Sequence, residues 1–326
     1  MREGGHLAEL LDKRSGVNPL WSPPWTSIDH SAYSPSKHPE YGGGGDARLL
    51  AGILGHNLCL DIFGGPSPEE QAAGVDPHGE GSRAAYEIDS DSAVLVMRAD
   101  FPLAQIRFSR RLELHGANLR FVETVQSLAA FDRPIGWTQH VTLSPPFIEP
   151  GATQVRCSAG LSKVFDGEFS AADYLQTGAE FTWPKAPRKD GGVHDLRLYS
   201  NAKVSGGYTA HLMTQQLHAF FTVFSPSTKV AVGYVWRQQD FPWMGIWEEN
   251  CSRVAPPWNS EAITLAMEFG VSPFPETRRE MVDRGKLFGV PTYRWLPAMA
   301  TLKAEYWATV RSGEAIPETL TWPGVS

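Results

Sequence analysis

The feature that most constrains the fold is a long series of short β patterns with almost no helical sequence between them. Residues 84–129 alternate apolar and polar side chains in several runs, separated by turn sequences such as "HGAN". Seven further runs follow, at residues 137–145, 153–160, 208–215, 219–226, 229–236, 262–270 and 300–313. Two segments, 67–74 and 171–178, are expected to be helical, and both are short. The pattern predicts an all-β fold, a large antiparallel β-sandwich with few short helices.

Composition fits one large globular domain. The chain has 326 residues, of which 42% are hydrophobic and 20% charged, enough for a sizeable core. We find no linker and no repeat, so we expect a single domain over residues 1–326. The net charge of -7 gives no reason to expect nucleic acid or an anionic membrane as partner. The oligomeric state is left open.

The cysteines and the first residues of the chain bear on the cellular compartment of the protein. Cys59, Cys157 and Cys251 are odd in number and widely spaced, which favours neither a disulfide framework nor a metal motif. The start "MREGGHLAELL" has no apolar core of a signal peptide, and no apolar run is long enough to span a bilayer. A reducing cytoplasm fits best, and a removed signal peptide stays open as the alternative.

The N-terminal quarter reads as loops that could surround a ligand. Residues 20–41 are rich in aromatic and polar side chains, and glycine-rich stretches begin at Tyr41 and Asp61. No dinucleotide-binding G-x-G-x-x-G motif is present. The chain has 11 tryptophans. Most should pack in the core, but their flat faces also suit sugar C–H groups.

Two kinds of titratable residue stand out. His56, His78 and His140 lie in the unusual sequences "AGILGHNLCLD", "DPHGEGSR" and "GWTQHVTLSPPF", and histidine suits acid–base chemistry near neutral pH. Glu268 ends the apolar run "ITLAMEF", where a buried charge costs several kcal/mol unless it is partnered. A histidine across a cleft would be a suitable partner. The alternative is that Glu268 faces solvent or caps a turn.

The order of these motifs resembles that of the aldose 1-epimerase (galactose mutarotase-like) family, as a divergent member. The histidine of "DPHGEG" corresponds to the first motif, that of "GWTQHVTL" to the second, and "MGIWEEN…LAMEFGVSPFP" to the segment that carries the family's glutamate. The resemblance covers nearly the whole chain and implies the galactose mutarotase-like sandwich. The departures are "HGEGSR" in place of the usual first motif, "MEF" in place of "IEP", and no aromatic residue after His140.

The resemblance implies an isomerase that interconverts sugar anomers without a cofactor or metal. Glu268 would take the proton of the C1 hydroxyl, His140 would protonate the ring oxygen, and His78 would hydrogen-bond the ring oxygen or a neighbouring hydroxyl. Trp247 would form a stacking platform under the sugar. Arg83 lies one position later than the arginine of the family's first motif and is also expected to bind substrate. His56, Asn57 and Asp61 are expected to add hydroxyl contacts because of their glycine-rich setting, not because of the resemblance.

Three alternatives remain at this point. The sandwich could bind carbohydrate or act in regulation without catalysis. It could be a glycoside hydrolase or lyase, which normally needs two carboxylates, with Glu80 and Glu268 as the pair. Whichever alternative holds, Glu248 or Glu249 could replace Glu268 as the working acid, although "EEN" is more typical of a solvated turn. A metal enzyme is the least supported, because the N-terminal histidines match no known ligand spacing: His30, His38, His56 and His78.

Overall fold

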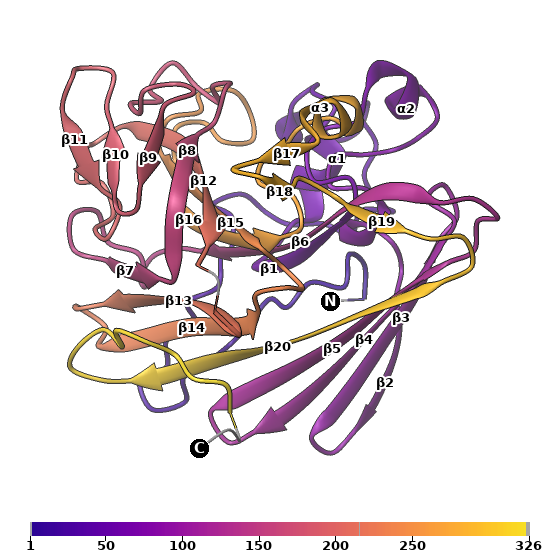
Figure 1. Cartoon of the computed structure of the whole chain (residues 1–326), viewed down its shortest axis with the longest axis horizontal. Helices are drawn as coiled ribbons and strands as arrows, with labels where there is room; N and C mark the ends of the chain where they lie inside the picture. Colours follow the sequence, from indigo (N-terminus) through magenta and orange to yellow (C-terminus); the bar gives the residue numbers. More distant parts are fainter. Residues whose placement is uncertain (1, 215, 324–326) are drawn as a thin grey trace.

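Two large sheets, each entirely antiparallel, form the molecule (Figure 1). The structure is a computed structural model, and it describes residues 2–214 and 216–323. Sheet A has the strand order β1-β6-β16-β15-β12-β8-β9, with β19 also paired to β6. Sheet B has the order β2-β3-β4-β5-β20-β14-β13-β7. The predicted antiparallel β-sandwich with few short helices is confirmed.

The strands of sheet A are β1 (His56–Asp61), β6 (Arg133–Leu143), β8 (Ala159–Val164), β9 (Glu180–Thr182), β12 (Ser205–Met213), β15 (Trp243–Asn250), β16 (Ile263–Gly270) and β19 (Arg294–Leu296). The strands of sheet B are β2 (Glu87–Asp91), β3 (Val94–Phe101), β4 (Ile106–His115), β5 (Asn118–Ser127), β7 (Gln154–Cys157), β13 (His218–Ser225), β14 (Val230–Arg237) and β20 (Thr301–Ser312).

The smaller elements are two hairpins and a few short helices. The hairpins are β10 (Lys185–Pro187) with β11 (Val193–Asp195), and β17 (Lys286–Leu287) with β18 (Val290–Pro291). The helices are η1 (Pro39–Tyr41), α1 (Ala47–Gly52), α2 (Pro68–Ala72), η2 (Glu80–Ser82) and α3 (Arg278–Arg284). Among the described residues, no helix has the length and apolar character that crossing a membrane requires.

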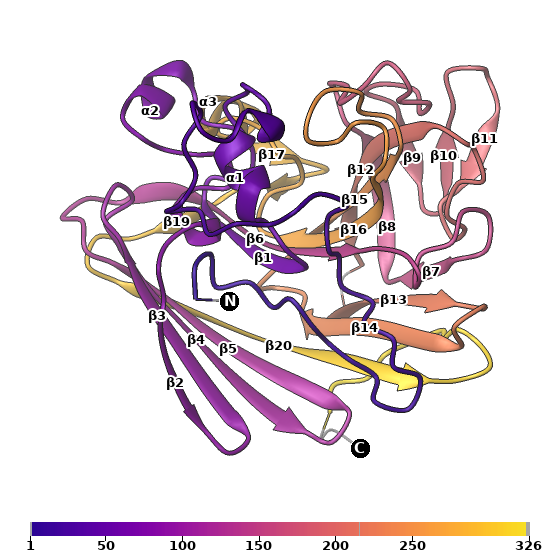
Figure 2. The same ribbon diagram turned by 180° about the vertical axis from the view of Figure 1, so that it is seen from behind.

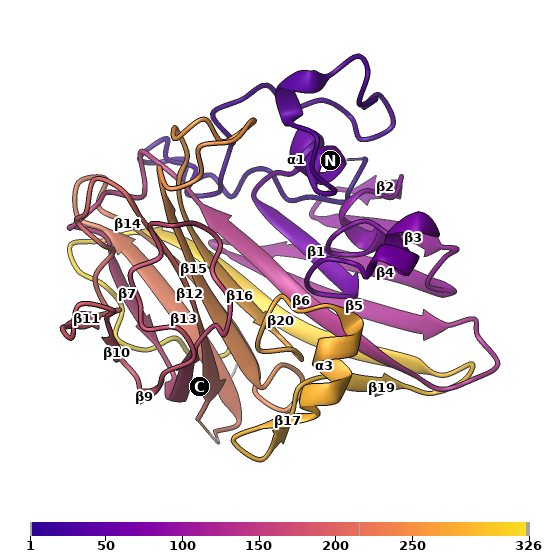
Figure 3. The ribbon, with the colours of Figure 1, turned by 90° about the horizontal axis from the view of Figure 1, so that it is seen from above.

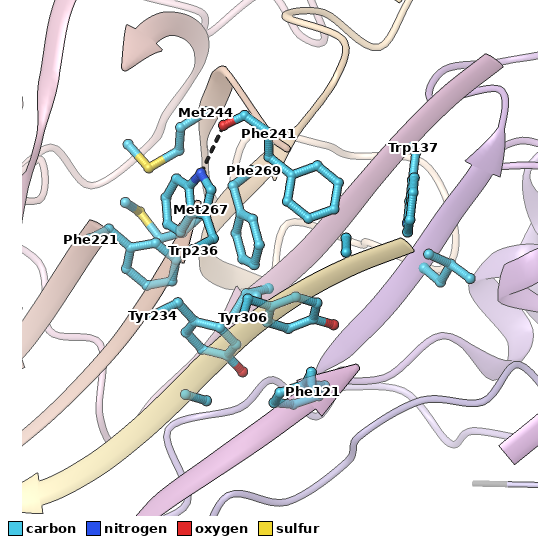
Figure 4. Close-up of a cluster of buried hydrophobic side chains, with 14 of the residues drawn as sticks. Phe121, Trp137, Phe221, Tyr234, Trp236, Phe241, Met244, Met267, Phe269 and Tyr306 are labelled. Carbon is cyan, nitrogen blue, oxygen red and sulfur yellow. Dashed lines mark hydrogen bonds between the residues drawn. The ribbon is translucent and has the colours of Figure 1, made fainter. Parts of the chain in front are cut away.

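Aromatic side chains from both sheets fill the space between them (Figure 4). The rings of Trp236 and Phe269 stack with centroids 4.3 Å apart, and those of Phe121 and Tyr306 with centroids 4.5 Å apart. The indole N–H of Trp236 donates to the carbonyl of Phe241 at 2.8 Å, so its one polar group is satisfied. Large, hydrogen-bonded aromatic side chains bury much apolar area and fix how the two sheets pack.

A second apolar cluster covers the other face of sheet A. It combines residues of the sheet, such as Trp243 and Trp247, with Leu49 and Leu50 of α1 and with Trp21 and Trp258 from loops. Figures 1 and 3 show α1, α2 and α3 on this side, away from sheet B. The central strands of sheet A are therefore covered on both faces, which explains why β6, β15 and β16 are buried almost throughout.

The N-terminal segment runs along the sandwich before it reaches α1. It is indigo in Figure 2, and it forms isolated bridges from Leu7 to His56 of β1 and from Leu20 to Leu143 of β6. These bridges place Trp21 at the covered face of sheet A, where it belongs to the second apolar cluster.

The short helices differ in part from expectation. A helix in 67–74 is confirmed as α2, which begins with a capping box between Ser67 and Glu70. The expected helix at 171–178 is wrong, because the Asp173 carboxylate accepts hydrogen bonds from the Phe169 amide and the Ser170 hydroxyl and forms a turn instead. Helix α1 was not expected in its glycine-rich surroundings.

The segment 248–250 is also different from expectation. "EEN" is the end of strand β15, not a solvated turn. Glu248 and Glu249 are buried, with exposed fractions of 7% and 1%. The Ser205 and Tyr174 hydroxyls donate to Glu248, and the Ser252 hydroxyl and amide donate to Glu249. These hydrogen bonds allow two carboxylates to be buried in the strand.

Candidate active site

The pairing of β6 with β16 places His140 directly opposite Glu268. The Nε2 atom of His140 lies 3.0 Å from the Oε1 atom of Glu268, and both side chains are buried. On its other side, the Nδ1 atom of His140 is 2.8 Å from the Thr142 hydroxyl. The carboxylate at the end of the apolar run thus has a histidine partner, which is held from both ring nitrogens.

Gly245 makes room for the side chain of Tyr208, the next residue of the site. Gly245 lies opposite Glu268 on β15, and a Cβ atom at this position would come within 2.0 Å of the Tyr208 hydroxyl. The Tyr208 hydroxyl donates to the carbonyl of Pro273 at 3.1 Å. Burial, and the nearby charge of Glu268, raise the pKa of Tyr208 well above its ordinary value, so the phenol stays protonated.

His78 reaches the same place from the loop after β1. Its backbone is left-handed, with φ of 65°, and is held by hydrogen bonds from its own N–H to the carbonyl of Gly64 and from the N–H of Leu60 to its carbonyl. Its ring stands edge-on to that of His140, with centroids 5.3 Å apart. Burial, then the proximity of His140, lower the pKa of His78 to about 3, so it is neutral near pH 7.

These side chains meet at a cavity of about 290 Å³ on the covered face of sheet A. His78, His140, Thr142, Tyr208 and Glu268 supply polar groups to its lining. Most of the remaining lining is apolar, with several large aromatic rings and part of α1: Trp21, Leu49, Leu50, Ile53, Phe63, Phe169, Trp247 and Trp258. A cavity that combines aromatic walls with a few convergent polar groups is typical of a small-ligand site.

Two further charged residues, Arg253 and Asp46, line the cavity. The guanidinium of Arg253 packs over the rings of Trp258 and Trp247, 4.6 Å and 5.1 Å from their centroids. Its Nε atom lies 3.4 Å from the buried carboxylate of Glu249. In the described residues its two terminal nitrogens have no hydrogen-bond partner, so they are available to a ligand.

Trp247 is the one expected substrate-binding residue that lines this cavity. Its ring centroid is 6.2 Å from that of His140, and its exposed fraction is 8%. The three expected catalytic residues, His78, His140 and Glu268, line it as well. The structure therefore brings together side chains that lie up to 190 positions apart in the sequence.

The other four expected substrate-binding residues lie outside the cavity lining. His56 points into the sandwich core, where it bonds to Gln139 at 3.0 Å. Asp61 is paired with Arg133 and Arg278. The side chains of His56 and Asp61 therefore bind other residues of the protein and do not face the cavity.

Arg83 and Asn57 are close to the site in the chain but do not line it either. Arg83 is paired with Asp76 at 2.6 Å and donates to the carbonyl of Gly74 at 2.9 Å, so it braces the loop that carries His78. Asn57 lies opposite His140 in the sheet and is fully buried. The alternative acid Glu80 is likewise outside the lining. Its carboxylate accepts a hydrogen bond from the amide of Ala104 at 2.9 Å.

Sequence reasoning did not find Arg253, Asp46, Tyr208 or Thr142. Thr142 had a usable signal, because it lies two residues after His140 on the same strand and so shares its face. The other three come from a loop, the start of α1 and the distant strand β12, and no local pattern marks them. Across residues 2–214 and 216–323 no cluster of three or more His, Cys, Asp or Glu side chains is arranged to hold a metal ion.

Comparison with known proteins gives a likeness of structure alone. No protein-family model and no curated protein matches the sequence. A proposed aldose 1-epimerase from Klebsiella pneumoniae superposes with a TM-score of 0.65 at 11% identity, over 92% of this chain and 73% of that one. A galactose mutarotase-like protein from Lactobacillus casei gives 0.58 at 14% identity, over 95% of both chains. A galactose mutarotase-like protein from Clostridium acetobutylicum gives 0.54 at 13% identity, over 95% of this chain and 90% of that one.

The fold is therefore that of the galactose mutarotase-like sandwich proteins, as the motif order predicted. The aldose 1-epimerases and mutarotase-like proteins among its structural neighbours are distant in sequence, with 11% to 14% identity in these comparisons. Identity this low shows the shared fold and leaves the activity of this chain to be argued from its own cavity.

Proposed function

We propose that the protein is an aldose 1-epimerase-like isomerase that interconverts the anomers of a free sugar or sugar derivative. The observation that carries the proposal is the buried pair of His140 Nε2 and Glu268 Oε1, 3.0 Å apart at an aromatic-lined cavity. Mutarotation needs one group that accepts a proton and one that donates a proton, at two neighbouring oxygens of the sugar. An adjacent carboxylate and imidazole meet this requirement.

In the proposed reaction, the Glu268 carboxylate takes the proton of the C1 hydroxyl. The bond from C1 to the ring oxygen breaks as the C1 carbonyl forms, and the ring oxygen takes a proton from His140. The open aldehyde rotates about the bond from C1 to C2. Ring closure from the other face returns one proton to His140 and the other from Glu268 to the C1 oxygen, so no cofactor is consumed.

The surrounding residues have supporting roles in this proposal. The Thr142 hydroxyl, 2.8 Å from His140 Nδ1, can accept the second ring proton when His140 is protonated. Trp247 supplies a flat surface for the C–H face of the sugar. His78 would hydrogen-bond the ring oxygen or a neighbouring hydroxyl. The free terminal nitrogens of Arg253 would donate to hydroxyls farther from the anomeric carbon.

The cavity charges favour a neutral sugar. Asp46 and Glu268 line the cavity together with Arg253, and the guanidinium of Arg253 is already paired with the buried carboxylate of Glu249. A phosphate or carboxylate on the substrate would meet more negative than positive charge. We therefore expect neutral aldoses to be turned over in preference to their phosphates or uronic acids.

The test is anomer exchange by NMR saturation transfer on a panel of neutral aldoses, with and without the protein. Acceleration by the parent and not by Glu268→Gln would support the proposal. Line broadening that shows binding, with no faster exchange for any sugar, would favour a non-catalytic carbohydrate-binding or regulatory protein. Neither binding nor exchange across the panel would refute a role with free aldoses.

A further inference from the structure

Cys59 contacts His78 from beneath the cavity lining. The Sγ atom of Cys59 is 2.9 Å from the Nδ1 atom of His78, and Cys59 is fully buried on β1. We propose that Cys59 is a positioning residue: its S–H donates to Nδ1 of His78 and holds the ring in the tautomer that carries its proton on Nε2. His78 would then act in the site as a hydrogen-bond donor.

The protonation states of the two groups support a positioning role over a nucleophilic one. Burial, with a smaller contribution from the charge of Glu268, raises the pKa of the Cys59 thiol well above its ordinary value. Burial lowers the pKa of His78 to about 3. At neutral pH the pair is a neutral thiol and a neutral imidazole, whereas a nucleophilic cysteine needs a thiolate.

A neutral pair leaves two arrangements, with the shared proton on sulfur or on Nδ1. The unprotonated nitrogen of an imidazole is a good acceptor, while a thiol sulfur accepts only weakly. The arrangement S–H to Nδ1 is therefore the stronger hydrogen bond. The alternative acceptor for the thiol, Oδ1 of Asn57, is 3.9 Å away, a full ångström longer than the contact with His78.

The geometry shows why such a contact matters. The backbone of His78 is fixed by hydrogen bonds with Gly64 and Leu60. Its imidazole contacts two further groups, the backbone of Phe63 and the thiol of Cys59. The thiol and the Phe63 backbone together limit rotation of the ring, and the S–H donor of Cys59 selects the tautomer with an unprotonated Nδ1. Because the ring of His78 stands edge-on to that of His140, 5.3 Å between centroids, a turned or re-protonated ring would also change the surroundings of the acid–base pair.

The tautomer can be measured without any substrate. Long-range ¹H–¹⁵N correlation spectra of the full chain report which ring nitrogen of each histidine is protonated, and His78→Asn identifies the His78 signals. We expect the Nε2–H tautomer in the parent and in Cys59→Ser, whose hydroxyl can still donate. Cys59→Val and Cys59→Ala remove the donor and should give a mixture of tautomers. Cys157→Ser, a half-buried cysteine in sheet B, is the control and should leave the His78 signals unchanged.

The effect on turnover rests on the proposed function. For anomer exchange, kcat/KM should fall roughly tenfold in Cys59→Val and Cys59→Ala, as expected for the loss of one hydrogen bond. It should stay within about threefold of the parent in Cys59→Ser. A parent that holds the Nδ1–H tautomer, or a Cys59→Val variant that keeps the parent spectrum, would overturn the inference. If Cys59→Val does not fold, Cys59→Ala against Cys59→Ser decides the same point. Tautomers as expected in a protein that turns over no aldose would uphold the role of Cys59 and refute the epimerase.

Discussion

Replacing Glu268 with glutamine tests the central carboxylate with little change of shape. The amide has the same planar geometry, and its oxygen can still accept a hydrogen bond from Nε2 of His140, now 3.0 Å from Oε1. What it loses is the capacity to accept a proton. A well-placed general base contributes about 10²–10⁴-fold to a rate, so kcat should fall by at least about 10²-fold.

The structure limits how far another group could replace this base. The second carboxylate of the cavity lining, Asp46, precedes α1 and belongs to a different wall from β16. The aromatic contacts to the sugar would remain in the variant, so KM should change much less than kcat. Glu248→Gln is a matched control, because Glu248 is a buried carboxylate on the neighbouring strand that lies outside the cavity lining.

The assay is the anomer exchange rate at saturating sugar, measured for both variants alongside thermal unfolding. Glu268→Gln should melt close to the parent and be nearly inactive, while Glu248→Gln should turn over like the parent. A Glu268→Gln enzyme within about threefold of the parent kcat would refute the assignment of Glu268 as the base, since that loss is far below the contribution expected of one.

Three further changes have defined outcomes. His140→Asn should lower kcat by about 10²-fold or more through loss of the proton donor, whereas His115→Asn, on the exposed end of β4, should match the parent; equal losses would contradict the assignment. Gly245→Ala should cost about 1–3 kcal/mol in unfolding free energy, because its Cβ would meet the Tyr208 hydroxyl at 2.0 Å; an unchanged denaturant midpoint would show that Tyr208 moves freely. Burial raises the pKa of Glu248 from 4.5 to about 7, so the stability gained from its protonated form is complete below pH 4.5 and lost as the pH rises through 7. Glu248→Gln should therefore flatten the pH dependence of stability between pH 5 and 8 by about 3 kcal/mol, and parallel curves for the two proteins would argue against this titration.

Strand content could be predicted because the sequence pattern and the burial coincide in sheet B. Strand β4 alternates buried and exposed residues over most of its length, as a strand with one core face should. The short helices were less predictable. In 171–178 a helix-like composition is overridden by the hydrogen bonds of Asp173, a tertiary arrangement that composition does not contain.

The three proposed catalytic residues were selected by their order, and their contacts depend on strand pairing. His140 and Glu268 are 128 positions apart, and they meet because β16 pairs with β6 in that one register. A shift by one residue would turn one of them to the opposite face. His56 shows the same rule from the other side: it was expected at the site, but its position on β1 directs it into the sandwich core, where it contacts Gln139.

The apolar run around Glu268 has its explanation in the cover over sheet A. Met267 and Phe269 face the core between the sheets, while Ala266 and Glu268 face the aromatic cluster and the cavity on the other side. A strand buried on both faces lacks the alternation of apolar and polar residues that marks a strand with one buried face. The run "ITLAMEF" therefore indicates a buried strand but not which face of the sheet Glu268 lies on. The pairing with His140 makes that burial tolerable, because a buried charge is stabilised by a close hydrogen-bonded partner. The same pairing sets the carboxylate at the cavity, so the feature that lets Glu268 exist inside the protein also places it where it can act.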